Sequence, residues 1–165
     1  MSIFDLNPKE LIQMGLTVER NGAAFYKALA GSVENEDVRD IFKFLESEEK
    51  RHIVDFNHLL GEFDHEDFKK MNDEESAYLN AVASTHIFSD IRGGKEFVKE
   101  FEDDLEALFY AVGFEKDSII FYEELKRFAK TPTARAAITR LIQQEKEHVV
   151  KLHRLITEIR PKKRR

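Results

Sequence analysis

The sequence predicts an all-α protein, a four-helix bundle with one long crossover between the second and third helices. Three observations support this prediction. Apolar residues recur at intervals of three and four, glycine and proline number only 7 and 3 in 165 residues, and the apolar pattern forms two pairs of long segments. The chain is long enough for one hydrophobic core and short for two, so we expect a single domain over residues 1–160.

Capping and stop residues mark the ends of the long helices, which we expect over residues 7–30, 35–60, 105–128 and 131–159. The first and fourth begin with a cap followed by proline, at Asn7 and Pro8 and at Thr131 and Pro132. Proline is tolerated there because the first N–H groups of a helix have no partner within it. Gly61 is expected to end the second helix.

The connection between the second and third helices is far too long for a tight turn between antiparallel neighbours. It therefore crosses the bundle, and the helices pair first with second and third with fourth. Within this crossover we expect a short helix over 74–83, a break at 92–94 and a helical turn or two over 95–101.

Charge and composition exclude several classes of protein. The formal net charge of -6 argues against a nucleic-acid binder, and the one basic cluster is the tail 161–165, which we expect to be disordered. The absence of cysteine excludes disulfides, thiolate metal sites and cysteine nucleophiles, so any metal must be held by Asp, Glu or His. No apolar run is long enough for a membrane span and no signal pattern opens the chain, so we expect a cytoplasmic protein without membrane contact.

An internal repeat relates the two helix pairs at an offset of 96 residues. Residues 19–26 align with residues 115–122, and the sequence Glu-Lys-Arg-His at 49–52 aligns with Glu-Lys-Glu-His at 145–148. The interval from the lone glutamate to the Glu-x-x-His pair is 30 residues in both halves. The repeat singles out these glutamates and histidines as candidate functional residues.

The repeated glutamates fall on apolar helical faces, where an unpaired carboxylate is costly. Glu19 shares a stripe with Leu16 and Ala23, and Glu49 lies between Phe42 and Phe56. The same periodicity turns the carboxylates of the second half inward. Four carboxylates are therefore predicted to point into the core: Glu19, Glu49, Glu115 and Glu145.

Two divalent cations would balance these four negative charges. In a Glu-x-x-His pair both side chains lie on one helical face and can reach the same metal, so His52 and His148 are predicted to be neutral ligands. Carboxylate and imidazole ligands with open positions suit iron or manganese. The alternative is a bundle whose inward Glu and His residues only make core hydrogen bonds.

With these six residues the sequence resembles the rubrerythrin branch of the ferritin-like superfamily over essentially the whole chain. The resemblance implies a ferritin-like fold and two iron ions, with di-manganese or a mixed pair as alternatives. It implies that Glu49 and Glu145 bridge the metals, that Glu19 and Glu115 each hold one, and that the two histidines complete the coordination. Tyr26 and Tyr122 also resemble tyrosines near the family's site, and core packing alone is an equal interpretation of them.

Two departures from the family pattern qualify these implications. Rubrerythrins add a cysteine-containing rubredoxin domain, and these 165 residues contain no cysteine, so electrons are expected from a separate rubredoxin-like donor. Rubrerythrins also commonly carry a further glutamate one turn after the third-helix ligand, where this chain has Ser118. The peroxide-linked iron movement associated with that glutamate is therefore not implied here.

The function expected from this resemblance is reduction of hydrogen peroxide or O2 at a non-haem di-iron site, as an oxidative-stress defence. A ferroxidase or iron-storage protein of the ferritin or bacterioferritin type is the alternative, and a bundle that holds metal only for stability is a third. We expect a homodimer or another small homo-oligomer. Four histidines and an acidic run outside the repeat are expected to be surface residues: His58, His65, His86, His153, Glu62, Asp64, Glu66 and Asp67.

Overall fold

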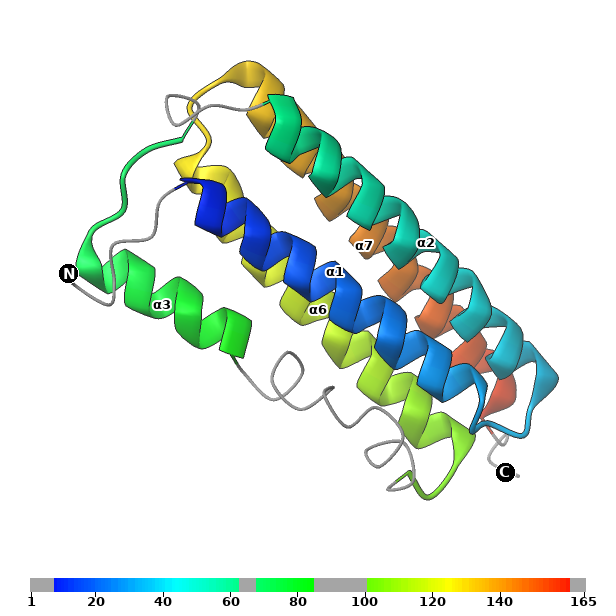
Figure 1. Ribbon diagram of the computed structural model, residues 1–165. Coiled ribbons are helices and arrows are strands. Elements are labelled where there is room, and N and C mark those ends of the chain that lie inside the picture. Colours follow the sequence, from blue (N-terminus) through cyan, green and yellow to red (C-terminus); the bar gives the residue numbers. More distant parts are fainter. Residues whose placement is uncertain (1–7, 63–67, 85–100, 161–165) are drawn as a thin grey trace.

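The computed structural model describes residues 8–62, 68–84 and 101–160, and these residues form a bundle of helices (Figure 1). The helices are α1 (Pro8–Ala30), α2 (Glu36–Glu62), α3 (Asp73–Ser84), α6 (Asp104–Phe128) and α7 (Pro132–Ile159). The described residues contain no β-strand, only an isolated bridge between Phe68 and Ala129. The predicted all-α bundle with a long crossover is confirmed.

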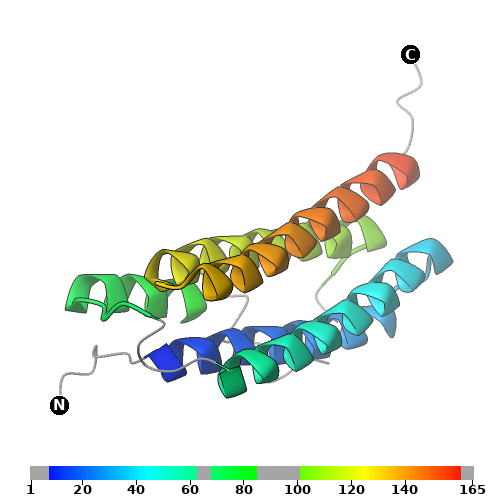
Figure 2. The same ribbon diagram turned by 90° about the horizontal axis from the view of Figure 1, so that it is seen from above.

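The four long helices form two layers, with α1 beside α2 in one and α6 beside α7 in the other (Figure 2). Across the layers, α2 packs against α7 and α1 against α6. Helix α3 belongs to the crossover and packs against α6. This is the pairing that short links within each half and one long connection between the halves predict.

Side-chain hydrogen bonds cap the starts of α2 and α7. The Thr131 hydroxyl accepts from the backbone N–H of Ala134, and the Asn35 side chain accepts from the N–H of Asp37 and Val38. Asn7 and residues 92–100 of the crossover lie outside the described residues. The short crossover helix is confirmed as α3, whereas Phe101 is not helical.

The expected end of α2 at Gly61 is wrong, because the helix continues through this glycine to Glu62. A glycine ends a helix by adopting a positive φ, and no glycine in the described residues does so. Gly61 instead takes helical dihedral angles, which are open to every residue.

The largest fully buried side chains of the core are phenylalanine and tyrosine rings. Phe25 of α1 and Phe114 of α6 stack with ring centroids 5.2 Å apart, and Tyr26 meets Phe114 edge-on at 5.8 Å. The rings of Tyr26 and Phe42 are 6.0 Å apart, which joins α2 to the same cluster. These rings fix the spacing of the helices around the middle of the bundle.

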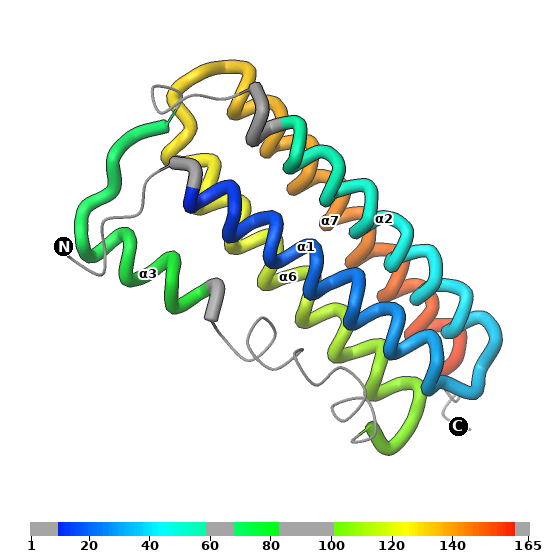
Figure 3. Tube along the Cα trace, in the orientation of Figure 1, coloured from blue at the N-terminus to red at the C-terminus, as the bar shows by residue number. Residues whose placement is uncertain are grey.

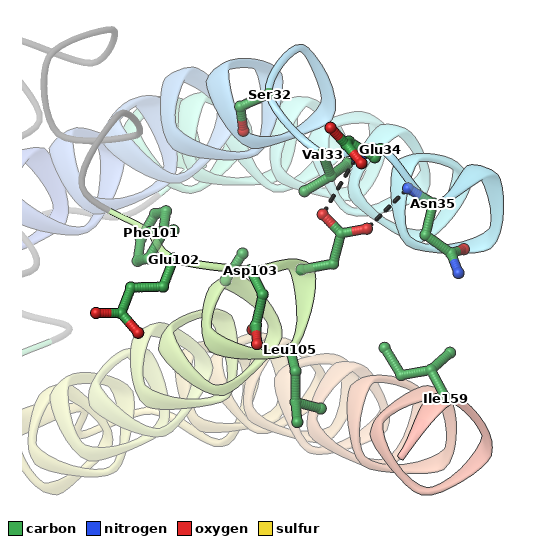
Figure 4. Close-up of a pocket in the computed structure, with 11 residues that line it drawn as sticks. Ser32, Val33, Glu34, Asn35, Phe101, Glu102, Asp103, Leu105 and Ile159 are labelled. Carbon is green, nitrogen blue, oxygen red and sulfur yellow. Dashed lines mark hydrogen bonds between the residues drawn. The ribbon is translucent and has the colours of Figure 1, made fainter. Parts of the chain in front are cut away.

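Asp104 joins the two halves at the end of the bundle where α6 begins, close to the α1–α2 turn (Figure 3). Its carboxylate accepts hydrogen bonds from the backbone N–H groups of Glu34 and Asn35, at 3.2 and 2.7 Å. These bonds lie at one side of a cavity of about 590 Å³ that is lined by the α1–α2 turn, the start of α6 and the end of α7 (Figure 4).

Among the described residues, no helix combines the length and the hydrophobicity of a membrane span.

Candidate metal centre

Six side chains from the four long helices meet inside the bundle, and all are at most 2% exposed. They are Glu19 from α1, Glu49 and His52 from α2, Glu115 from α6, and Glu145 and His148 from α7. The apolar stripes predicted to face the core do face it, because helical periodicity carries the repeated glutamates inward with them. The structure thus brings all six sequence-predicted residues together.

The donor atoms form two groups of four. One contains Glu19, Glu49, His52 and Glu145, and the other contains Glu49, Glu115, Glu145 and His148. Within each group the donor atoms lie within 4.8 Å of one another. Glu49 and Glu145 belong to both groups, which is the arrangement that two metals bridged by two carboxylates require.

Glu145 lies between the two imidazole rings. Its Oε1 is 3.0 Å from His52 Nδ1, and its Oε2 is 3.0 Å from His148 Nδ1. His52 Nδ1 is also 3.1 Å from Glu19 Oε2, and His148 Nδ1 is 3.5 Å from Glu115 Oε2. Both histidines therefore turn the same ring nitrogen towards carboxylates of their own four-donor group.

A cation fits this chemistry, because the carboxylates are buried without enough protein partners. Glu49 Oε1 lies in the interior and has no hydrogen-bond partner among the described residues. Leaving such a group unpaired costs about 1–3 kcal/mol, and more when it is charged. A divalent ion held by oxygen and imidazole nitrogen removes that cost, so the residues present suit iron or manganese.

The six side chains of the two four-donor groups are called the cage below. Without metal, the carboxylates of the cage repel one another. Burial raises the pKa of Glu49 well above its ordinary value, and the charges of Glu19 and Glu145 raise it further. Burial, followed by the charge of Glu145, raises the pKa of Glu115 to about 8. The metal-free cage therefore retains protons on carboxyl groups that are ordinarily ionised at neutral pH.

The histidines shift in the direction that complements those carboxylates. Burial lowers the pKa of His52, but hydrogen bonds to Glu145 and Glu19 outweigh it and raise the pKa to about 11. The pKa of His148 rises to about 9 for the same reason, since its bonds to Glu115 and Glu145 outweigh burial. Burial also acts to raise the pKa of Glu145, yet the hydrogen bonds from His148 and His52 prevail and lower it. Glu145 is thus the carboxylate that the two imidazolium rings stabilise as an anion.

Two buried tyrosines each bind one of the two carboxylates that belong to a single four-donor group, Glu19 and Glu115, which we call the terminal carboxylates. Each of these hydrogen bonds joins one half of the repeat to the other. The Tyr26 hydroxyl of α1 donates to Glu115 Oε1 of α6, and the Tyr122 hydroxyl of α6 donates to Glu19 Oε1 of α1. Both rings are fully buried, and burial raises the pKa of each phenol well above 10. Each tyrosine therefore stays a neutral donor that orients one carboxylate, in addition to its place in the core.

Comparisons with known proteins identify a family and a shared fold for this chain. The family model for rubrerythrin matches residues 10–156. The chain belongs to the rubrerythrin family. A crystal structure from Thermotoga maritima, described as that of a ferritin-like diiron-carboxylate protein, is similar with a TM-score of 0.75 and 24% sequence identity. The similarity covers 93% of this chain and 97% of that one, and it shows a shared fold. A comparison with curated proteins gave no match.

This rubrerythrin-family chain carries small residues one helical turn after Glu19 and Glu115. Ser118 follows Glu115 by one turn on α6 and is 2% exposed. Its repeat equivalent is Gly22 on α1, three residues after Glu19, which is also buried. Neither position adds a fifth carboxylate to Glu19, Glu49, Glu115 and Glu145. His58 and His153 are exposed as expected, whereas His65, His86, Asp64, Glu66 and Asp67 lie outside the described residues, as does the side chain of Glu62.

Sequence reasoning missed Glu48, a further buried carboxylate beside the cage. It is 9% exposed, its Oε2 lies 3.9 Å from His148 Nε2, and it forms an ion pair with Arg51. The corresponding residue of the second half is Gln144. The sequence held a signal for Glu48, because it lies four residues before His52 and therefore near the same helical face. It was overlooked because, of two adjacent charged residues such as Glu48 and Glu49, one is commonly exposed to solvent.

The position of Glu48 predicts that the two four-donor groups bind metal with different affinities. A carboxylate near the outer nitrogen of a ligating histidine fixes the ring and makes it more basic, and removing such a partner costs about 10- to 100-fold in metal affinity. Glu48→Gln is therefore expected to weaken binding of one of two metals, measured by competition with a chelator. The exposed Glu147→Gln is the control. Equal affinities in Glu48→Gln and the parent protein would show that the carboxylate does not act on His148.

Proposed function

We propose that this rubrerythrin-family protein binds two iron ions in the cage and reduces hydrogen peroxide or O2 with electrons from a separate protein donor. The observation that carries the proposal is the pair of four-donor groups sharing Glu49 and Glu145. A mononuclear site or a hydrogen-bonded core has no need for two shared carboxylates. The proposed ligands are the six residues of the two groups.

Bound ferrous ions would supply two electrons, enough to convert one H2O2 and two protons into two water molecules. The protein residues position and enclose this chemistry. Tyr26 and Tyr122 orient the terminal carboxylates through their hydroxyl hydrogen bonds. The buried rings of Phe42 and Phe114 pack on Tyr26, and that of Phe56 packs on Tyr122. Burial from bulk water strengthens the charge interactions of the carboxylates that these tyrosines bind.

The composition of these 165 residues supports the proposed external electron donor. They contain no cysteine and therefore no thiolate-bound iron centre that could receive electrons. Oxidised iron in the cage would have to be reduced by another molecule after each turnover. A rubredoxin-like protein is the donor that the family resemblance favours, and we propose that the chain acts as a homodimer or small homo-oligomer.

Anaerobic loading followed by separate exposure to H2O2 and O2 tests the proposed function. We expect about two irons per chain after desalting, as the di-iron ligand set requires. One equivalent of H2O2 should oxidise both in stopped-flow absorbance, and repeated cycles should follow only when a reductant is supplied. Retention of no iron would contradict the di-iron proposal. Uptake of many ferric ions per chain into a large shell, seen by sedimentation, would instead support iron storage.

A further inference from the structure

Gly22 lies where a side chain would meet one of the two shared carboxylates. It is a buried position in the middle of α1, three residues after Glu19. A Cβ atom placed on it would lie 2.8 Å from Glu49 Oε2 and 3.0 Å from Glu49 Cδ. It would also lie 3.0 Å from Cε1 of Phe114. Carbon atoms that are not bonded do not approach other heavy atoms so closely without displacing them.

The neighbours of Gly22 differ in their freedom to move. Phe114 is fully buried, and it stacks on Phe25 and meets Tyr26 edge-on, so its ring is held on two sides. The carboxylate of Glu49 is the end of a flexible side chain. An added methyl group at residue 22 would therefore displace the Glu49 carboxylate from its place beside α1.

Helix propensity gives no reason for glycine at this position. A glycine in the interior of a helix destabilises it relative to alanine, and Gly22 has no positive φ that would call for glycine. The aligned residue of the second half, Ser118, does carry a side chain at the same level of the bundle. Of the two aligned positions, only that of the first half lacks a side chain.

We infer that Gly22 is a positioning residue, whose missing side chain reserves the space in which the Glu49 carboxylate reaches both metals. This inference rests on the proposed two-metal site. Gly22 is needed in the metal-loaded protein, because the Glu49 carboxylate must then stay in place. The metal-free protein does not need this glycine, because the carboxylate can then move aside.

Gly22→Ala separates these two requirements. We expect its metal-free form to be as stable as the parent in urea unfolding, because alanine favours the helix while Glu49 yields. We expect its affinity for Co(II), measured by chelator competition, to fall at least about tenfold, as losses of ligand positioning typically do. The visible absorption of bound Co(II) should change, because it reports the coordination geometry.

Two further variants distinguish crowding from other effects. Ala24→Gly, at an exposed position on the same helix, should lower the stability of the metal-free protein and leave Co(II) affinity unchanged. Glu49→Asp withdraws the carboxylate by one methylene, so it should cost less affinity in the Gly22→Ala background than in the parent.

Each outcome decides the inference. Parent-like Co(II) affinity in Gly22→Ala would overturn it and leave the two-metal proposal standing. Loss of metal-free stability in Gly22→Ala, with unchanged affinity per folded molecule, would make Gly22 a packing residue and also overturn it. Absence of Co(II) binding in the parent protein would overturn the two-metal site itself, and the inference with it.

Discussion

Glu49→Gln and Glu145→Gln will both abolish two-metal binding, yet only the second will destabilise the metal-free protein. Both glutamates belong to both four-donor groups, so the loss of either removes a ligand from both metals. An amide of the same shape is a poor substitute for an anionic bridge. Metal content after desalting is expected to fall from about two per chain to below about one in each variant.

The effects on the metal-free fold differ because the two carboxylates have different partners. Burial and the neighbouring charges of Glu19 and Glu145 raise the pKa of Glu49, so a neutral amide resembles the form it already favours. Hydrogen bonds from His148 and His52 lower the pKa of Glu145 instead, and its removal leaves two buried imidazolium groups without their shared anion. Breaking a buried pair in this way costs about 3–5 kcal/mol.

Urea unfolding of the chelator-treated proteins measures this difference. Glu49→Gln should match the parent or exceed it in free energy of unfolding, and Glu145→Gln should fall clearly below both. The exposed Glu147→Gln controls for the loss of a negative charge on α7. Equal destabilisation by the two cage substitutions would contradict the assignment of Glu145 as the anion between the histidines.

The second large effect is that raising the pH lowers the stability of the metal-free protein and raises its affinity for metal. Folding raises the pKa of Glu115 from 4.5 to about 8, so its stabilising contribution is complete below about pH 4.5 and is lost as the pH rises through about 8. Folding also raises the pKa of His148 from 6.5 to about 9, so its contribution is lost as the pH rises from about 6.5 through about 9. The melting temperature of the metal-free protein is therefore expected to fall between pH 5 and 9.5.

Metal ligands must release these protons before they bind, so metal affinity will rise over the same pH range. At pH 7 the cage retains protons on Glu115, His52 and His148, whose pKa values lie near 8, 11 and 9. Titration calorimetry in buffers of different ionisation enthalpy should thus detect more than about one proton released per metal. Glu115→Gln should reduce that number, and proton release near zero in the parent protein would contradict the protonated cage.

The fold class, most helix ends and the six residues of the cage can be predicted from the amino-acid pattern. The repeat offset of 96 and the shared interval of 30 fix which residues correspond, and 3.6 residues per turn fixes which of them face the core. These are properties of single helices, and local periodicity is sufficient to predict them. The end of α2 was not predicted correctly, because glycine can adopt several backbone conformations and the residue type does not decide which one Gly61 takes.

The tertiary structure was needed to learn which side chains meet across helices. It joined Tyr26 to Glu115 and Tyr122 to Glu19, brought Glu48 to His148, and set Gly22 against Glu49. It also made Glu145, and not its repeat partner Glu49, the anion between the two histidines. Such contacts depend on the axial rotation and separation of neighbouring helices, which the packing of the whole core sets and no pattern within one helix contains.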